Sequence, residues 1–330
     1  MMRVLFDTMK IKTVPQDFIV NEVSNVEVKD KGRFLYFLLK KENWNTLDVV
    51  RKLSSALHVP QKSIGFAGSK DKKAVTTQLI SFVNVSRERV EDIILNDISL
   101  EFVGYGDKPI SLGDLSGNAF EIVVRDVSGC SEISFIPNYF DTQRFGEYNV
   151  RIGKALVKKD FHEAVRVAIR TGQCEELREH TAKFPQDYVG ALQQVPIRHL
   201  RMYVNAYQSW LWNETVSRYI NDIEKEVKYK EGMFIFPKHF IDLDVPYIGW
   251  AGEVDGEFES IINEIMKEEE ITFEDFLIRQ IPKISLEGGL RKACVPVGDF
   301  QCEEVDDGVK LSFFLPKGSY ATMVVKGLFG

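Results

Sequence analysis

The stretch from Ile64 to Phe82 constrains the fold more than any other part of this sequence. Apolar residues lead into it, β-favouring residues lead out of it, and small and charged residues fill the centre, Gly68-Ser69-Lys70-Asp71-Lys72-Lys73-Ala74. A cluster of this composition between two β-favouring runs is typical of a loop. We therefore expect Asp71 to lie in a loop at the end of a strand.

This loop sets one carboxylate among three ammonium groups. Lys70, Lys72 and Lys73 would hold Asp71 ionised if their side chains point toward it. An ionised carboxylate beside cations suits a nucleophile or base that faces an anionic substrate. The alternative is an ordinary charged turn whose side chains are simply solvated. The pattern alone leaves both interpretations open.

The preceding segments predict two strands and a helix. Residues 11–23 alternate apolar and polar after Pro15, which indicates a strand, and residues 32–40 form a dense apolar run typical of a central strand buried on both faces. Thr46 is placed to be the N-cap of a helix that runs to His58, because apolar residues follow it at helical spacing. Strand, helix, loop and strand in this order indicate an α/β arrangement.

The rest of the chain changes character twice. Residues 117–126 alternate as a strand, with Gly117-Asn118-Ala119-Phe120 as a turn into it. A mainly helical region follows, with predicted helices at 154–170, 197–220, 261–266 and 273–281 and a short strand at 233–237. Gly288-Gly289 marks a return to strands, at 310–315 and 321–326, on either side of a turn that carries Tyr320.

Composition and charge narrow the class of protein. A length of 330 residues predicts two domains, and a hydrophobic content of 44% is enough for a buried core. No apolar run is long enough to span a membrane.

The net charge of -7 argues against indiscriminate nucleic-acid binding, but a local basic track is still compatible with it. Basic residues gather at 70–73, 144–159 and 198–201, and acidic residues at 253–275. This separation of charge would be found in an RNA enzyme whose acidic residues lie away from the RNA. It would also be found on an ordinary solvated surface of mixed charge.

The four cysteines, Cys130, Cys174, Cys294 and Cys302, are scattered along the chain without a Cys-x-x-Cys pair. No histidine accompanies the closest two, so a structural zinc site is not expected. We predict buried or unreactive thiols, which fits a reducing cytoplasm.

A second polar segment follows Pro137. Asn138, Phe140, Gln143 and Arg144 supply an amide, an aromatic ring, a second amide and a guanidinium within a few residues. Stacking surfaces, hydrogen bonds to a base edge and a charge for the backbone are what a single-stranded RNA site needs. The alternative for Gln143 and Arg144 is a structural role, in which they hold the loop on the core.

These segments resemble the TruD family of tRNA pseudouridine synthases. The family signature Gly-x-Lys-Asp-x-x-Ala-x-Thr-x-Gln is matched by Gly68, Lys70, Asp71, Ala74, Thr76 or Thr77, and Gln78. Further segments that resemble the family are Pro15–Glu22, Gly117–Phe120, Asn138–Gly146, Asn205–Asn213 and Pro316–Thr322. The chain departs from the family at Asp141, where glycine is common. If that turn needs a positive φ, aspartate would be strained there, whereas glycine would not.

The resemblance implies a fold and a domain organisation. It implies an α/β (α+β) protein with a mixed, mostly antiparallel sheet of the pseudouridine-synthase type and flanking helices. Residues 1–152 and 291–330 would form the catalytic domain. Residues 153–290 would form an inserted, mainly helical domain particular to the family.

The resemblance also implies an activity, the isomerisation of uridine to pseudouridine, at uridine 13 in the D-arm of tRNA. No cofactor and no metal would be needed, tRNA would be the partner, and no membrane or obligate protein partner is expected. Asp71 would be catalytic and Lys12 would pair with it. The implied substrate-binding residues are Phe18, Lys70, Asn138, Phe140, Gln143, Arg144 and Tyr320. A non-catalytic tRNA chaperone of the same fold and a metal-dependent hydrolase built on Asp71 are the competing hypotheses.

Overall fold

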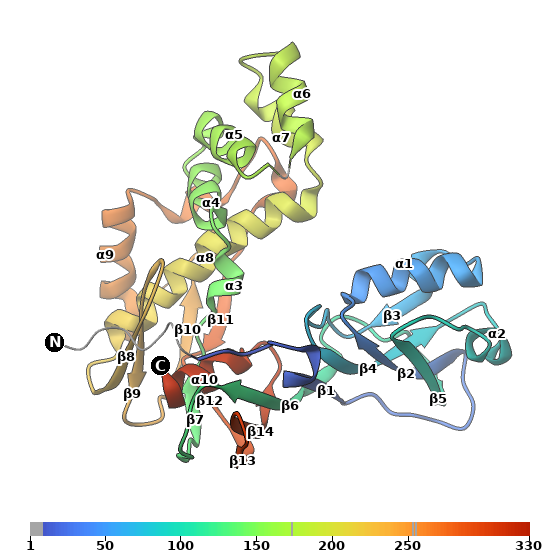
Figure 1. Ribbon diagram of the computed structural model, residues 1–330. Coiled ribbons are helices and arrows are strands. Elements are labelled where there is room, and N and C mark those ends of the chain that lie inside the picture. The colour runs from blue at the N-terminus through green and yellow to red at the C-terminus, as the bar shows by residue number, and fades with distance from the viewer. Residues whose placement is uncertain (1–8, 173, 253, 255) are drawn as a thin grey trace. The chain divides into compact units, whose positions relative to one another are not determined.

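The computed structural model describes residues 9–172, 174–252, 254 and 256–330. The chain divides into two compact units (Figure 1). Unit 1 comprises Met1–Phe135 and Pro296–Gly330, and unit 2 comprises Ile136–Val295. The assignment of residues 153–290 to a family-specific insertion stays a prediction.

Unit 1 is built on an eight-stranded sheet in the order β13-β14-β6-β1-β4-β2-β5, with β3 paired to β4 (Figure 1). Its strands are β1 (Phe18–Ser24), β2 (Phe34–Glu42), β3 (Ile64–Phe66), β4 (Val75–Phe82), β5 (Ile98–Gly106), β6 (Leu115–Arg125), β13 (Gly298–Val305) and β14 (Gly308–Pro316). Among the described strands of this sheet, β1 and β4 are the one parallel pair, and all other pairings are antiparallel. The predicted mostly antiparallel sheet is confirmed.

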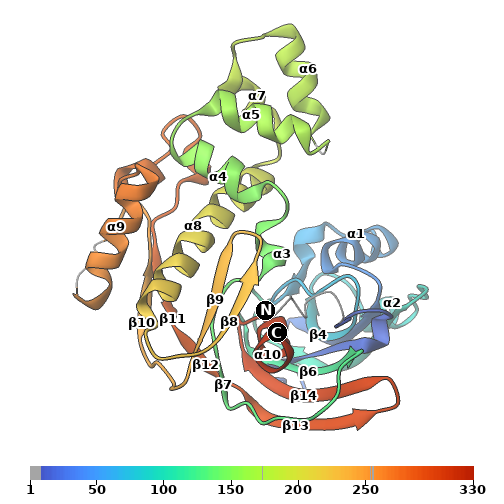
Figure 2. The ribbon, with the colours of Figure 1, turned by 60° about the vertical axis from the view of Figure 1, so that its left-hand side comes forward.

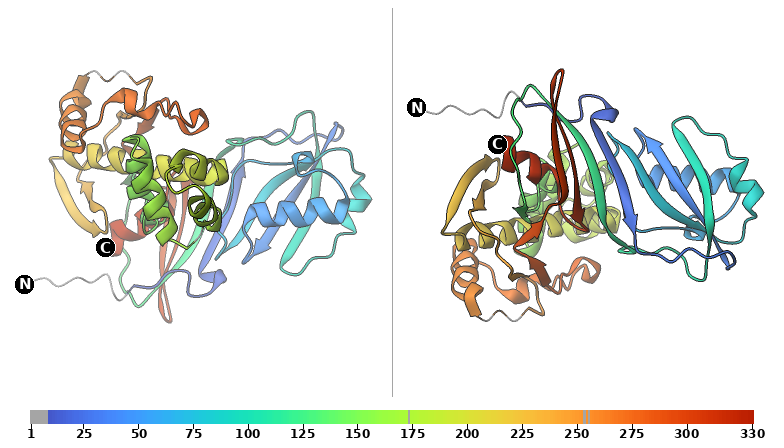
Figure 3. Two further views of the ribbon diagram at one scale, coloured as in Figure 1. Left: turned by 90° about the horizontal axis from the view of Figure 1, so that it is seen from above. Right: turned by 90° about the horizontal axis from the view of Figure 1, so that it is seen from below.

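Helix α1 (Thr46–Leu57) covers one face of this sheet (Figures 1 and 3). Its apolar side packs on β2, β3 and β4 in a core formed by Phe37, Leu39, Val49, Val50, Leu53, Leu57, Ile64, Ile80 and Phe82, among others. The N-cap is Asn45, whose side chain accepts a hydrogen bond from the Asp48 amide, so the prediction that Thr46 caps the helix is wrong by one residue. An amide oxygen at position 45 performs the capping, and the Thr46 hydroxyl is left for another role.

The other helices of unit 1 are α2 (Arg87–Glu91) and α10 (Ala321–Phe329), with short 3-10 turns at Pro15–Asp17 and Gln61–Ser63. The predicted strand at 321–326 is therefore wrong. The run is apolar enough for either structure, but Ala321, Val324 and Val325 fall at the i, i+3, i+4 spacing of a helix and are all buried. Tyr320 stands directly before α10 rather than at a hairpin tip.

The predicted turn at Gly117–Phe120 is also wrong, because these residues lie inside β6. Gly117 pairs with Val23 on one side and Pro316 on the other. A Cβ atom at position 117 would lie 2.2 Å from the carbonyl oxygen of Leu315. Glycine is therefore required here by the close approach of β14 and not by a change in chain direction.

Unit 2 is organised around the long helix α8 (Ile197–Tyr219), which packs against α4, α9 and β10 (Figures 1 and 2). Its other helices are α3 (Thr142–Phe145), α4 (Asn149–Val157), α5 (Phe161–Arg170), α6 (Glu175–Lys183), α7 (Tyr188–Gln194) and α9 (Glu259–Glu269), with 3-10 turns at Gly256–Phe258, Phe273–Phe276 and Pro282–Ile284. Its strands pair as β8 (Ile223–Tyr229) with β9 (Gly232–Pro237) and β10 (Asp244–Tyr247) with β11 (Gly289–Lys292). A further ribbon joins β7 (Phe135–Pro137) to β12 (Cys294–Pro296).

Two helix predictions in unit 2 need correction. The predicted helix at 154–170 is two helices, because Lys159 adopts a positive φ of 59° and Asp160 caps α5 by accepting a hydrogen bond from the Glu163 amide. The predicted helix at 273–281 is only the 3-10 turn Phe273–Phe276, which Asp275 closes by accepting from Thr272. The predicted strand at 233–237 is confirmed as β9.

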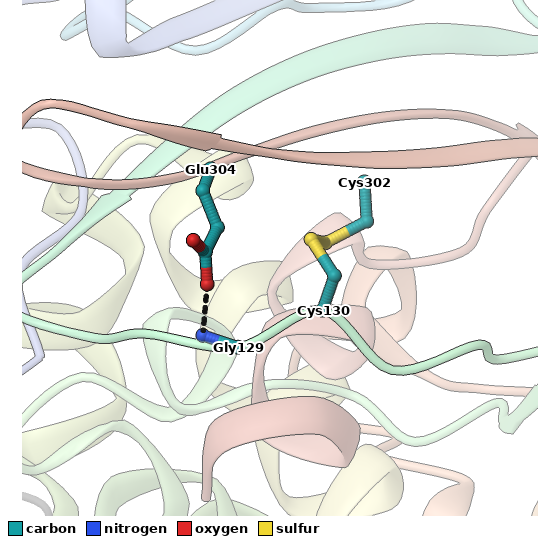
Figure 4. Close-up of a disulfide and its surroundings, with 4 residues drawn as sticks. All are labelled: Gly129, Cys130, Cys302 and Glu304. Carbon is teal, nitrogen blue, oxygen red and sulfur yellow. Dashed lines mark hydrogen bonds between the residues drawn. A yellow bond between two sulfur atoms is a disulfide. The ribbon is translucent and has the colours of Figure 1, made fainter.

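Cys130 and Cys302 form a disulfide, so the prediction of free thiols is wrong for these two residues (Figure 4). The bond ties the segment between β6 and β7 to β13, and the Glu304 carboxylate accepts a hydrogen bond from the Gly129 amide beside it (Figure 4). The two cysteines are 172 residues apart in sequence, so their spacing gave no sign of the pairing. Cys174 and Cys294 are buried and unbonded, as predicted. None of the described helices has the length and apolar character needed to cross a membrane.

Candidate active site

Asp71 lies in the loop that joins β3 to β4, as predicted, and its carboxylate forms an ion pair with Lys12 at 3.2 Å. The parallel pairing of β1 with β4 accounts for this meeting. Ile19 lies opposite Val75, so the segments that precede the two strands leave the sheet at the same edge. Lys12 reaches Asp71 from the first segment, and its backbone has a positive φ of 57°.

The ion pair is partly enclosed. The Lys12 side chain is 17% exposed and the Asp71 side chain 34% exposed. The Lys12 ammonium lies 3.9 Å from the centre of the Phe18 ring, which is itself buried against Phe120. The structure therefore brings together Asp71, Lys12 and Phe18, and leaves the Asp71 side chain partly exposed to solvent.

The loop lysines do not surround Asp71 in the way that the sequence suggested. Lys70 turns inward, where its ammonium lies 2.6 Å from a Glu22 carboxylate oxygen and donates to the Asn118 side-chain oxygen at 2.8 Å. Glu22 also accepts a hydrogen bond from the Leu79 amide. Lys72 and Lys73 are exposed. Lys70 thus fastens the loop to β1 and β6, and the cation at the Asp71 carboxylate is Lys12.

The backbone of the loop is held by side chains from the surrounding elements. Gln78 donates to the Gly68 carbonyl at 3.0 Å and accepts from the Thr46 hydroxyl. The same hydroxyl accepts a hydrogen bond from the Lys70 amide at 3.0 Å. Gln78 belongs to the signature that the sequence carries, and the structure shows that it stabilises the loop from β4.

Lys41 is a further loop contact that sequence reasoning did not single out. Its ammonium donates to the carbonyl of Asp71 at 2.9 Å and to the carbonyl of Trp44. Lys41 is 1% exposed, and this burial lowers its pKa to about 8, against an opposing effect of Asp71 and with a smaller contribution from Lys70. One signal was present in the sequence, because Lys41 occupies the same inward register of β2 as Phe37 and Leu39.

In unit 2, Asn138 is held by Arg291 of β11. The Arg291 guanidinium donates to the Asn138 backbone oxygen at 2.8 Å and to its side-chain oxygen at 2.7 Å. The Asn138 side-chain nitrogen donates to the Lys292 carbonyl. Arg291 also lies 4.2 Å from the centre of the Phe140 ring. Sequence reasoning missed Arg291, which follows a glycine pair and stands 153 residues from its partner.

Phe140 is buried among aromatic rings. Its ring meets Trp212 edge-on at 5.7 Å and Tyr247 at 5.9 Å, and both its amide and its carbonyl bond to the Asn213 side chain of α8. Arg144 donates to Ser209 of α8 and lies 5.6 Å from the Phe140 ring. The hydrogen bond from Arg144 to Ser209 agrees with the alternative interpretation, in which Arg144 holds its loop on the core.

The remaining predicted residues are placed as follows. Gln143 is exposed on α3, and Tyr320 is half-buried before α10. Asp141 has a φ of -84° and caps α3 by accepting a hydrogen bond from the Thr142 amide. Aspartate is therefore not strained at this position, where a positive φ would have favoured glycine. The positive φ falls instead on Gly146, at 56°.

The predicted site residues are divided between the two units. Unit 1 holds Lys12, Phe18, Lys70, Asp71 and Tyr320, and unit 2 holds Asn138, Phe140, Gln143 and Arg144. Among the described residues, no group of three His, Cys, Asp or Glu side chains is placed to hold a metal ion.

The mostly antiparallel sheet, with a lysine-paired aspartate on one of its loops, and the helical second unit define a mixed α+β class of protein. The sequence matches the family described as tRNA pseudouridine synthase D (TruD) over residues 7–184, 174–239 and 234–328. The tRNA pseudouridine synthase D of Aquifex aeolicus is 32% identical, covering 97% of this chain and 98% of the relative. A relative from Thermococcus sibiricus is 30% identical, covering 96% of this chain and 94% of the relative.

A crystal structure from Methanosarcina mazei that carries the TruD name has a similar fold. It matches with a TM-score of 0.69 at 27% identity, covering 97% of this chain and 93% of that chain. This chain belongs to the TruD family of tRNA pseudouridine synthases. The resemblance that the signature around Asp71 indicated is therefore confirmed.

Proposed function

We propose that this chain is a tRNA pseudouridine synthase in which Asp71 is the catalytic carboxylate and uridine 13 of the D-arm is the target. Family membership supports the reaction class, and the names of the relatives support tRNA as the substrate. The observation that carries the residue assignment is the 3.2 Å ion pair between Lys12 and Asp71 on the signature loop. The proposal includes a cytoplasmic location, no cofactor and no obligate protein partner.

The reaction is an isomerisation. The N1–C1′ bond of uridine breaks, the uracil turns, a C5–C1′ bond forms, and the proton from C5 is replaced by one on N1. Positive charge builds on the ribose as the first bond breaks, and a carboxylate beside it stabilises that charge, as in glycoside hydrolysis. Asp71 is partly exposed and carries Lys12 on one side, which suits this role. It acts either by covalent addition or by removing a ribose proton, and both routes balance without a redox step.

The other predicted residues have distinct proposed roles. Phe140 and Tyr320 would supply ring surfaces for the detached uracil, and Asn138 would position it. Gln143 and Arg144 would contact the RNA around the target nucleotide. Phe18 and Lys70 would support the site indirectly. The Phe18 ring packs against the Lys12 ammonium, and Lys70 is paired with Glu22. A structured tRNA must release the uridine from its stack, so base flipping is implied.

The decisive experiment compares wild type with Asp71→Asn on tRNA transcripts, with Asp30→Asn, an exposed aspartate elsewhere in unit 1, as the matched control. Pseudouridine is mapped by its carbodiimide adducts, and tRNA binding is measured in parallel. We expect Asp71→Asn to bind tRNA without turnover and Asp30→Asn to behave as wild type. Full activity of Asp71→Asn would overturn the site assignment.

Two further controls separate the competing functions. A transcript with cytidine at position 13 should give no adduct there, and the absence of an adduct at uridine 13 of the wild-type transcript would refute the proposed target. A wild-type protein that binds tRNA but forms no pseudouridine would support the chaperone alternative. Activity that is abolished by EDTA and restored by a divalent cation would support the metal-dependent hydrolase instead.

A further inference from the structure

We propose that Lys41 is a positioning residue that fixes the Asp71 peptide for catalysis through its main-chain carbonyl. The inference rests on the proposed catalytic role of Asp71. Lys41 does not touch the Asp71 carboxylate in this arrangement, since Lys12 has that contact. The two lysines therefore hold the same residue at different atoms.

The position of Lys41 in the sheet makes an ammonium group unexpected there. In β2, Phe37, Leu39 and Lys41 occupy the inward register and are all buried, whereas Lys40 on the opposite face is exposed. A buried ammonium must give up its hydration, which is costly unless hydrogen bonds replace it. An apolar side chain of similar length would fill the same space without that cost. Packing alone therefore does not explain a lysine at this position.

The contacts of the ammonium group supply the explanation. The ammonium donates to two main-chain carbonyls, that of Trp44 at 2.5 Å and that of Asp71 at 2.9 Å. Trp44 lies in the turn between β2 and α1, directly before the N-cap Asn45. Lys41 thus ties the Asp71 peptide to the start of a packed helix. The carbonyl carbon of Asp71 is bonded to its Cα atom. A hydrogen bond that fixes the carbonyl therefore also restrains the position from which the Asp71 side chain extends.

The neighbouring restraints leave a specific task for Lys41. Gly68 and Lys70 are held by Gln78 and Thr46, and the Ala74 carbonyl accepts from the Asn43 amide. Between these points, Lys41 donates to the main-chain carbonyl of Asp71. A loop of this length that loses its central restraint can shift while both ends stay in place. A displacement of about 1 Å at a reacting group is enough to cost on the order of 100-fold in rate.

The test compares Lys41→Met with Lys40→Met, a lysine-to-methionine change on the opposite face of the same strand. Lys41→Met keeps the length and packing of the side chain and removes its donors. We expect it to fold and to bind tRNA within about threefold of wild type, while its single-turnover rate falls roughly 10- to 100-fold. Lys40→Met should match wild type in folding and rate. A merely structural role for Lys41 would lower stability and leave the rate of the folded enzyme unchanged.

Hydrogen exchange gives a readout that does not depend on activity. In Lys41→Met, amides in residues 67–75 should exchange faster, whereas those in the centre of β2 and β4 should not. Lys41→Gln is the second variant, since its amide keeps two donors, and we expect an intermediate rate. A wild-type rate in folded Lys41→Met, or in Lys41→Gln if only that variant folds, would overturn the proposal. Failure of both variants to fold would also overturn it, because Lys41 would then serve stability alone.

Asp71→Asn belongs in the same series, so that the two proposals can fail separately. An active Asp71→Asn would refute the proposed catalytic role, and the Lys41 inference would fall with it. An inactive Asp71→Asn together with a fully active Lys41→Met would refute the Lys41 inference alone.

Discussion

Glu22 and Lys70 form an ion pair at 2.6 Å whose side chains are 0% and 6% exposed. The pair joins the Asp71 loop to β1, and Asn118 of β6 adds a hydrogen bond to the same ammonium. The removal of one partner from a buried pair leaves the other charge without compensation, which is far more costly than the loss of an exposed pair. The anchorage of the loop thus depends on both residues together.

We therefore expect Glu22→Gln to lower the free energy of unfolding by about 3 kcal/mol. The exposed pair Arg87–Glu91 provides the matched control, and Glu91→Gln should change the free energy of unfolding by less than about 1 kcal/mol. Urea denaturation measures both. The double variant Glu22→Gln/Lys70→Met should recover part of the loss, since neither charge is then left alone. Equal effects of Glu22→Gln and Glu91→Gln would contradict the burial of the pair.

Asp17 predicts a loss of stability in acid. Its pKa lies below the usual value of 3.8, chiefly because the Arg125 side chain donates to the carboxylate, with burial opposing this effect. A depressed folded-state pKa means that the stabilisation is complete above the unfolded-state pKa and disappears as the pH falls through the folded-state pKa. Unfolding midpoints measured from pH 6 down to pH 2 should fall less steeply for Asp17→Asn than for wild type. Parallel curves for the two proteins would count against this assignment.

Lys41 predicts the opposite trend in alkali. Its pKa is lowered from 10.5 to about 8 by burial, so between these two values the unfolded chain carries a proton that the folded chain has released. Stability contributed by this group therefore rises with pH between about 8 and 10.5. In Lys41→Met that rise should be absent from unfolding curves measured over the same range. An unchanged rise in the variant would show that another group is responsible.

The Cys130–Cys302 disulfide predicts sensitivity to reductant. The bond closes a loop of 172 residues, and cross-links of native proteins typically contribute about 2–5 kcal/mol, mainly by constraining the unfolded chain. Dithiothreitol should lower the free energy of unfolding of wild type by that amount. It should have no effect on Cys130→Ser/Cys302→Ser, which is the control for other actions of the reductant.

Arg291 predicts a strong effect of a conservative substitution. Lysine cannot reproduce the planar fork that reaches both oxygens of Asn138. If Asn138 positions the uracil, Arg291→Lys should lower the single-turnover rate about tenfold, which corresponds to one charge-assisted hydrogen bond. Arg279→Lys is the control, because that guanidinium pairs with Glu274 on an exposed surface. Equal rates for Arg291→Lys and wild type would refute the positioning role.

Local patterns were sufficient for several strands, among them β2, β4, β6, β9 and β14, and for the loop that carries Asp71. The apolar run of β2 and the charged loop depend on neighbours in sequence, and the structure confirms them. The strand predicted over residues 11–23 begins only at Phe18, because Pro15–Asp17 form a 3-10 turn before it. Residues 321–326 were mistaken for a strand because the short apolar run Met323–Val325 satisfies either period, and only packing decides between them.

The contacts that shape the site could not be predicted in the same way. Lys41 meets Asp71 across 30 residues, Arg291 meets Asn138 across 153, and the cysteines pair across 172. The role of Gln78 illustrates the difference. The signature identified it, but only the fold shows that its amide holds the Gly68 carbonyl.

The parallel alignment of β1 with β4 has a consequence for how the enzyme matures. Those two strands are direct neighbours in the sheet but are separated along the chain by β2, α1 and β3. Such distant pairings form slowly compared with hairpins. We therefore expect Lys12 to meet Asp71 only once these two strands have paired, so a chain with an incomplete sheet would lack the ion pair on which the proposed reaction depends.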